Sequence, residues 1–246
     1  LKMGVSEIAP LTFRAVTLPF AGLGLLAVAV LSGASIRIPR PLWIKVALLA
    51  LFNIAGWNGL LLFGVQQLPA GRSAILAFTM PVWSVLFSLV LLHEPLSKRK
   101  LVGMALGVLG LGVLLGEDIR HLQRTPTAAL FIVGAAISWA FGTVLLRKWK
   151  LPVPQNALSG WLMIVGWVPL ALLAPLAAPP GPLTMPSAGA WFAILYNIFL
   201  AGTFAHWAWF TLARTLPVAV SSMSSLPVPI VGVFAGMLVL GERPGA

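Results

Sequence analysis

The sequence contains no cysteine and very few charged residues. Without cysteine, the chain can form no disulfide and no thiolate-ligated zinc or iron–sulfur site. Only 9% of its 246 residues are charged and 59% are hydrophobic, whereas a typical soluble domain carries about 25% charged residues. So few charges could not cover the surface of a soluble globule of this size. Most of the outer surface must therefore face lipid.

Acidic residues are especially scarce, and each lies at or beyond the end of an apolar stretch: Glu7, Glu94, Glu117, Asp118 and Glu242. The sequence therefore predicts no carboxylate proton relay at mid-membrane depth, a feature of many pumps. Enzyme motifs are missing too. His93-Glu94 is followed by Pro95 and does not complete an HExxH zinc motif, and the chain has no Walker loop. We expect no enzymatic activity, no metal and no cofactor.

Long apolar runs dominate what remains. About 20 apolar residues cross the roughly 30 Å of hydrocarbon in a bilayer. Eight stretches approach or reach this length: 11–31, 43–65, 73–92, 101–116, 128–146, 158–174, 190–213 and 218–240. The fourth is short, but Gly103 and Gly107 form a GxxxG face that permits close helix packing. The predicted fold class is an all-α integral membrane bundle.

The net charge of +11 is distributed in short clusters between these stretches. If the stretches span the membrane in turn, ten cations fall on one side: Arg37, Arg40, Lys45, Lys98, Arg99, Lys100, Arg147, Lys148, Lys150 and Arg214. Five fall on the other side: Lys2, Arg72, Arg120, Arg124 and Arg243. The positive-inside rule places the ten-cation side in the cytoplasm. A nucleic-acid-binding face would instead gather its cations on one element.

The chain also contains an internal repeat. A shift of 148 residues aligns these pairs without gaps: Leu68-Pro69 with Leu216-Pro217, Ser73 with Ser221, Pro81 with Pro229, Val85 with Val233, Leu92 with Leu240 and Glu94 with Glu242. The charge count places the Glu94 end in the cytoplasm and the Glu242 end outside. The two copies are therefore expected to have inverted topology, a common plan of secondary transporters. We predict one repeat over residues 1–125 and the other over 126–246.

Several motifs follow one another in a characteristic order: Pro10 to Arg14, Leu68-Pro69-Ala70, Thr79-Met80-Pro81-Val82 running to His93-Glu94-Pro95, the glycines 103, 107 and 110, Ser138-Trp139-Ala140 running to Leu146-Arg147-Lys148, Leu216-Pro217, and Pro229 to Glu242. With these motifs the chain resembles the EamA-type branch of the drug/metabolite transporter superfamily. Within this branch it is similar to the YddG-type exporters of amino acids and related metabolites. The resemblance implies ten helices in two five-helix repeats, with one helix before the first visible stretch and one after the eighth.

Polar residues inside apolar stretches are the candidate substrate ligands. Asn58 and His206 occupy the same position in the repeat, and each is flanked by tryptophan. Because polar side chains avoid lipid, both are expected to face the bundle interior; the alternative is a histidine satisfied by a neighbouring helix. The full set of substrate-binding candidates is Asn58, Thr79, Trp83, Ser138, Trp139, His206, Trp209 and Ser225.

Two prolines are expected to kink their helices. Pro81 and Pro229 would free the carbonyls of Ala77 and Ser225, which must then meet protein, water or substrate. The alternative is a packing kink whose carbonyl is satisfied by serine or threonine.

We therefore expect a secondary transporter that exports small metabolites, with amino acids favoured by the resemblance, through alternating access in a bacterial inner membrane. A cavity without carboxylates favours zwitterionic or neutral solutes over strongly cationic drugs. A non-transporting receptor or structural membrane protein is the alternative, and an ion channel is less favoured because no ring of like charges is visible. The expected partners are a small-molecule substrate and the lipid bilayer, without nucleic acid, and a monomer is the working expectation.

Overall fold

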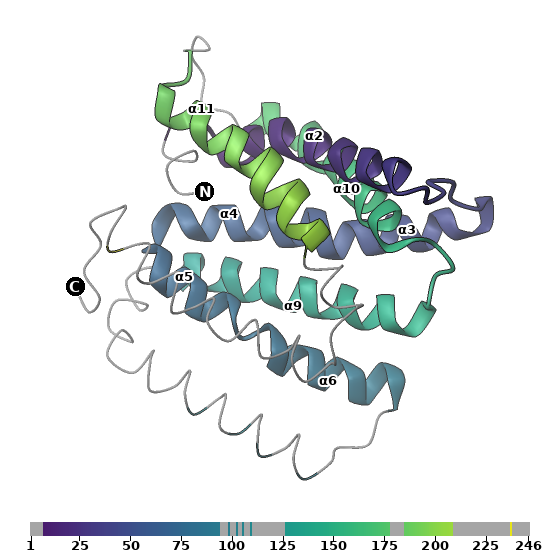
Figure 1. The fold of residues 1–246 in the computed structure, drawn as a ribbon. Coiled ribbons are helices and arrows are strands. Elements are labelled where there is room, and N and C mark those ends of the chain that lie inside the picture. The colour runs from purple at the N-terminus through teal and green to yellow at the C-terminus, as the bar shows by residue number, and fades with distance from the viewer. Residues whose placement is uncertain are drawn as a thin grey trace.

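The computed structural model describes residues 7–93, 126–177 and 185–208, with isolated helical positions at 98, 102, 105, 109 and 237. All regular elements of this described part are helical (Figure 1). The α-helices are α2 (Pro10–Leu31), α3 (Trp43–Ala50), α4 (Trp57–Gln67), α5 (Ala70–Ala77), α6 (Met80–Leu92), α9 (Pro126–Trp149), α10 (Gln155–Ala177) and α11 (Ala188–Leu195). A 3₁₀ turn, η1 (Arg40–Leu42), precedes α3, and two π-helical segments, η2 (Leu51–Gly56) and η3 (Tyr196–Phe204), continue α3 and α11.

Six helical spans in the described part are long and apolar enough to cross a membrane: Pro10–Leu31, Arg40–Gln67, Gly71–Leu92, Pro126–Trp149, Gln155–Pro175 and Ala188–Ala208. They coincide with six of the eight predicted stretches, so the all-α membrane class is confirmed. The stretch 218–240 falls outside the described residues apart from position 237, and 101–116 apart from positions 102, 105 and 109. The predicted superposition of the helices at 73–92 and 221–240 is therefore not covered by the described residues.

Helices α2 and α10 pack against each other along the bundle and run in opposite directions (Figure 1). Two glycines allow the close approach. A Cβ added to Gly22 would lie 3.0 Å from the Gly160 carbonyl oxygen, and a Cβ added to Gly160 would lie 3.0 Å from the Gly22 oxygen. Leu18, Leu25 and other apolar side chains of α2 complete this interface in one large core cluster with α10 and α3. The interface joins the two halves of the chain.

The same interface provides a hydrogen-bond donor for a main-chain carbonyl of α2 that has no partner within the helix. Pro19 lies inside this helix and has no N–H, so the Ala15 carbonyl lacks its usual partner four residues later. The indole of Trp167 in α10 donates Nε1–H to that Ala15 oxygen at 2.7 Å. A second indole of α10, Trp161, donates to the Ile36 carbonyl at 2.7 Å, in the segment between α2 and η1. The second half of the chain therefore supplies hydrogen bonds to two main-chain carbonyls of the first half.

The stretch 73–92 departs from the predicted continuous, kinked helix. It is divided between α5 and α6, with a turn at Phe78 and Thr79, and Pro81 occupies the first turn of α6. Proline is favoured there because the first helical N–H groups have no intrahelical acceptor. Thr79 Oγ1 donates to the Leu76 carbonyl at 2.7 Å. The threonine thus stabilises the break through the Leu76 carbonyl and not through that of Ala77, and Pro81 itself is exposed.

Candidate functional site

Two π-helical segments lie at corresponding places in the two halves of the chain. Segment η2 leads into Trp57-Asn58, and η3 leads towards His206-Trp207. A π segment replaces the regular i→i−4 pattern, and single π turns are frequent at functional sites. Neither segment was predicted from the sequence.

Side chains satisfy main-chain carbonyls in both segments. In η2, Ser138 of α9 donates to the Phe52 carbonyl at 2.8 Å, and Asn58 donates to Ile54 at 2.9 Å. In η3, Thr203 donates to Ile198 at 2.9 Å, and His206 Nδ1–H donates to Ala201 at 2.9 Å. In a bilayer, every such carbonyl needs an internal partner. These four side chains therefore permit π geometry at membrane depth.

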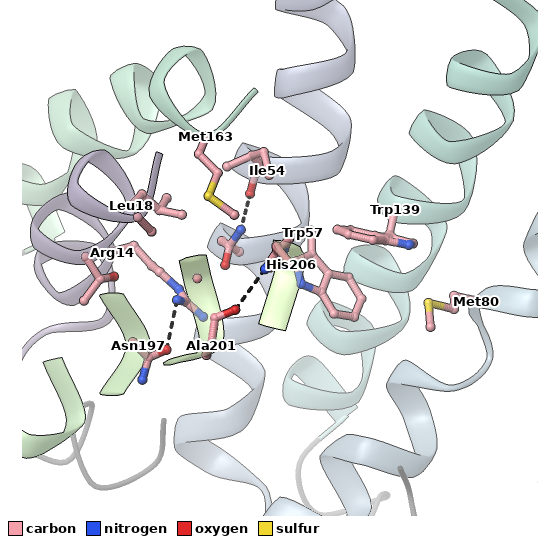
Figure 2. Close-up of a pocket in the computed structure, with 14 residues that line it drawn as sticks. Arg14, Leu18, Ile54, Trp57, Met80, Trp139, Met163, Asn197, Ala201 and His206 are labelled. Atoms are coloured by element: carbon pink, nitrogen blue, oxygen red, sulfur yellow. Dashed lines mark hydrogen bonds between the residues drawn. The ribbon is translucent and has the colours of Figure 1, made fainter. Parts of the chain in front are cut away.

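A cavity of about 250 Å³ lies beside both segments, between the two halves of the chain (Figure 2). Its polar lining consists of Arg14 and Thr17 from α2, Asn58 from α4, Asn197 from η3, and His206. Its aromatic and sulfur-containing lining consists of Trp57, Met80, Trp139 and Met163, from α4, α6, α9 and α10. Leu18, Ala21, Ile54, Ala201 and Gly202 complete the wall. No carboxylate is among the described residues that line it.

Three predicted site residues lie in this cavity: Asn58, Trp139 and His206. Asn58 and His206 share more than the repeat position, because each donates to a carbonyl of its own π segment. The Nδ1 of the histidine is thus bonded within its own helix. Trp139 packs against Trp57, with ring centroids 5.2 Å apart and planes at 55°.

The other described candidates lie outside the cavity lining. Trp83 Nε1 donates to Thr79 Oγ1 at 3.3 Å, so these two side chains bond one another at the start of α6. Ser138 faces η2, and a Cβ on Gly56 would collide with it, which indicates a packing role. Trp209, Ser225 and Pro229 fall outside the described residues.

Arg14 and Asn197 were not among the sequence candidates. Arg14 Nη1 donates to Asn197 Oδ1 at 3.3 Å, linking α2 to η3. The signal for Arg14 was present: it is a cation inside an apolar stretch, and such residues are usually functional. Because this rule holds for cations as well as for acids, Arg14 could have been predicted from the sequence. Asn197 is a single polar residue in an apolar run, and its sequence position does not reveal its partner.

A contact at one end of the bundle joins the two halves. Ser187 begins α11, where its hydroxyl accepts from the Ala190 N–H at 3.2 Å. The same hydroxyl donates to Glu7 Oε1 at 2.6 Å, and the Ser187 N–H donates to Oε2 at 3.1 Å. These hydrogen bonds, chiefly the one from the Ser187 hydroxyl, hold the pKa of the exposed Glu7 carboxyl below its ordinary value. At the opposite end, Lys45 Nζ lies 5.9 Å from the Trp149 ring centroid, so two of the cation-rich segments meet there.

Both halves of the chain match the same family of known proteins. Residues 1–116 and 126–246 each match the EamA-like transporter family. The uncharacterized transporter YoaV of Bacillus subtilis is 24% identical over 99% of this chain and 83% of its own length. The uncharacterized inner membrane transporter YedA of Escherichia coli is 29% identical over 98% of this chain and 78% of its own. Protein PecM of Dickeya dadantii is 28% identical over 82% of this chain and 67% of its own length.

A solved crystal structure has the same fold, with a TM-score of 0.71 and 20% identity over 97% of this chain and 82% of the other. The matches to the family extend over both halves of the chain, and the described helices have the length and apolarity of membrane spans. We conclude that this chain is a multi-pass membrane transporter, not an enzyme, and that it belongs to the EamA-like transporter family.

Proposed function

We propose that the chain is a secondary transporter that exports a small metabolite, an amino acid or a related compound, by alternating access of the cavity. The observation that carries this proposal is the position of the cavity. Its wall combines α2, η2, α4 and α6 from the first half with α9, α10 and η3 from the second. Substrate sites of transporters built from inverted repeats lie at such an interface, near the middle of the membrane.

The depth and size of the cavity support the proposal. Trp139 lies near the middle of the 24-residue α9, and Asn58 lies well inside the span Arg40–Gln67. A volume of about 250 Å³ corresponds to roughly eight water molecules at about 30 Å³ each. This is room for a small metabolite, near the lower end of the range of about 300–1,000 Å³ for ligand pockets.

Alternating access requires the two repeats to move relative to each other. The glycine-mediated contact of α2 with α10 is a suitable axis for that motion, because two glycines bring the backbones of the two halves together there. The Glu7–Ser187 bonds join the repeats at one end and would break when that end opens. The charge count assigns this end to the outside of the cell. The name of YedA supports an inner membrane location, and the division at residues 125 and 126 remains our proposed repeat boundary.

Counterflow in proteoliposomes tests the proposal. Vesicles holding the purified protein are loaded with one unlabelled metabolite at a time, and uptake of the labelled compound is followed without an imposed ion gradient. We expect transient accumulation for at least one small metabolite. Ala201→Phe fills the cavity and should abolish this accumulation. Ala205→Phe, at an exposed position four residues later, should leave the accumulation unchanged. A failure of every small metabolite, or equal flux through both variants, would contradict the proposal and favour a receptor or structural role.

A further inference from the structure

Among the described residues that line the cavity, Arg14 has the one permanently charged side chain. A guanidinium stays protonated under all physiological conditions and offers five N–H donors. One of them, on Nη1, reaches Asn197 Oδ1, and the group also lies 5.9 Å from the Phe13 ring centroid. Its Nε is buried and donates to no acceptor among the described residues. Arg14 therefore has unused hydrogen-bonding capacity at the cavity wall.

The charge of Arg14 also lacks a protein counter-charge in the described part. Glu7 is the acid that the described residues contain, and it is exposed and bonded to Ser187. A buried cation without a partner is costly, and this cost is largest where lipid replaces water around the bundle. An anion that enters the cavity would remove it. The planar fork of a guanidinium matches a carboxylate with two parallel hydrogen bonds.

The rest of the wall suits an organic body and not a bare inorganic ion. The tilted pair of Trp57 and Trp139 presents flat apolar surfaces, and Met80 and Met163 add adaptable ones. In Figure 2 these tryptophans and Arg14 occupy different parts of the cavity wall. A ligand that reaches both needs a charged end and an apolar body.

From this arrangement we infer that Arg14 binds the carboxylate of the substrate, and that the substrate is a small organic acid, amino acids included, whose apolar body packs against Trp57 and Trp139. This inference rests on the proposed transport function and adds the class of substrate. It narrows the sequence-based preference for zwitterionic or neutral solutes to those that carry a carboxylate, because Arg14 lines the cavity. Arg14 also lies at the contact between α2 and η3, so substrate binding would reach both repeats at once.

Matched pairs of ligands test the inference on the unmodified protein. Small aromatic and aliphatic carboxylates are each compared with the corresponding primary amide, which keeps the shape and removes the charge. Binding is measured as a ligand-dependent rise in the unfolding temperature of purified protein, and transport as counterflow. Because hydrogen bonds to charged groups contribute about 1.5–3 kcal/mol, the amide should bind roughly ten- to a hundredfold more weakly.

Variants then assign the effect to Arg14. Arg14→Gln should lose the discrimination between acid and amide, and Arg14→Lys, which keeps the charge without the fork, should retain part of it. Lys148→Gln removes an exposed cation outside the cavity and should change neither the binding of the acid nor that of the amide. If Arg14→Gln does not fold, the ligand pairs on wild type and Arg14→Lys decide the matter alone.

The failures of the two proposals are distinguishable. Counterflow of a substrate that has no anionic group, or equal binding of acid and amide, overturns the inference and leaves the transport function intact. Acid binding that Arg14→Gln preserves also overturns it. Absence of any counterflow, together with absence of binding, overturns the transport function itself.

Discussion

Replacing Trp167 by phenylalanine removes one hydrogen-bond donor from the interface between the two repeats and keeps most of the ring. The acceptor, the Ala15 carbonyl, has no helical partner because Pro19 stands four residues later. In Trp167→Phe this carbonyl is left unsatisfied inside the bundle, which costs about 1–3 kcal/mol. Measured contributions of hydrogen bonds between membrane helices average about 0.6 kcal/mol, with a maximum of about 1.7 kcal/mol. We therefore expect a loss of about 1–2 kcal/mol of unfolding free energy.

A double-mutant cycle isolates this hydrogen bond from the loss of ring contacts. Pro19→Ala gives α2 an N–H that takes the Ala15 carbonyl, so Trp167→Phe should then cost less than about 0.5 kcal/mol. The coupling energy between positions 19 and 167 should be about 1 kcal/mol or more. The matched control is Trp161→Phe, because its acceptor, the Ile36 carbonyl, lies in a partly exposed segment outside the helices, where water can replace the indole.

Thermal unfolding in detergent, followed by far-ultraviolet circular dichroism, measures all five proteins of this set. At about 2–4 °C per kcal/mol for a chain of this size, Trp167→Phe should lower the unfolding temperature by about 2–8 °C. Trp161→Phe should lower it by less. Equal losses for the two tryptophans, or the same loss from Trp167→Phe with and without Pro19, would refute the assignment of this bond to the proline-freed carbonyl.

Three further predictions concern the interface of α2 with α10, the contact of Glu7 with Ser187, and the orientation of the chain in the membrane. Gly22→Val should separate α2 from α10 and lower the unfolding temperature by several degrees, since even a Cβ there would lie 3.0 Å from a facing carbonyl oxygen; unchanged stability would contradict the close approach. Wild type should be more stable than Glu7→Gln at pH 7, and this advantage should disappear as the pH falls below about 4, because the bonds to Ser187 lower the pKa of Glu7 and favour its ionised form. A pH-independent difference would show that the charge of this carboxylate is irrelevant. Single cysteines in place of the exposed Lys148 and Met185 should react with an impermeant reagent in intact cells at 185 and not at 148; the opposite pattern would reverse the orientation.

The membrane class and the positions of the six described spans were predictable because a hydrocarbon layer imposes its own length and composition on each span. That requirement acts on every segment separately, so it is visible without tertiary contacts. The pairing of Asn58 with His206 was also predictable, because a duplication places equivalent residues at equivalent depths. Both side chains line the cavity that contains Arg14, between the two halves of the chain.

The break between α5 and α6 could not be predicted from the sequence. Pro81 is compatible with a kink inside a helix and with the first turn of a new one, and the local sequence does not choose between them. The π segments have no residue signature either. Segment η2 depends on Ser138, which is 86 residues away in the sequence and donates to the Phe52 carbonyl.

The position of Arg14 at the cavity wall also depends on packing that the sequence does not reveal. Taken alone, a cation five residues into a helix can extend its long side chain to the membrane surface, and the sequence contains nothing to prevent it. In the folded chain, η3 packs across α2, and Asn197 Oδ1 accepts a hydrogen bond from the guanidinium at the cavity wall. The sequence by itself determined the six described spans, because the lipid bilayer acts on each segment separately. The packing of the two repeats alone decided which polar side chains meet, since those contacts join residues up to 183 positions apart.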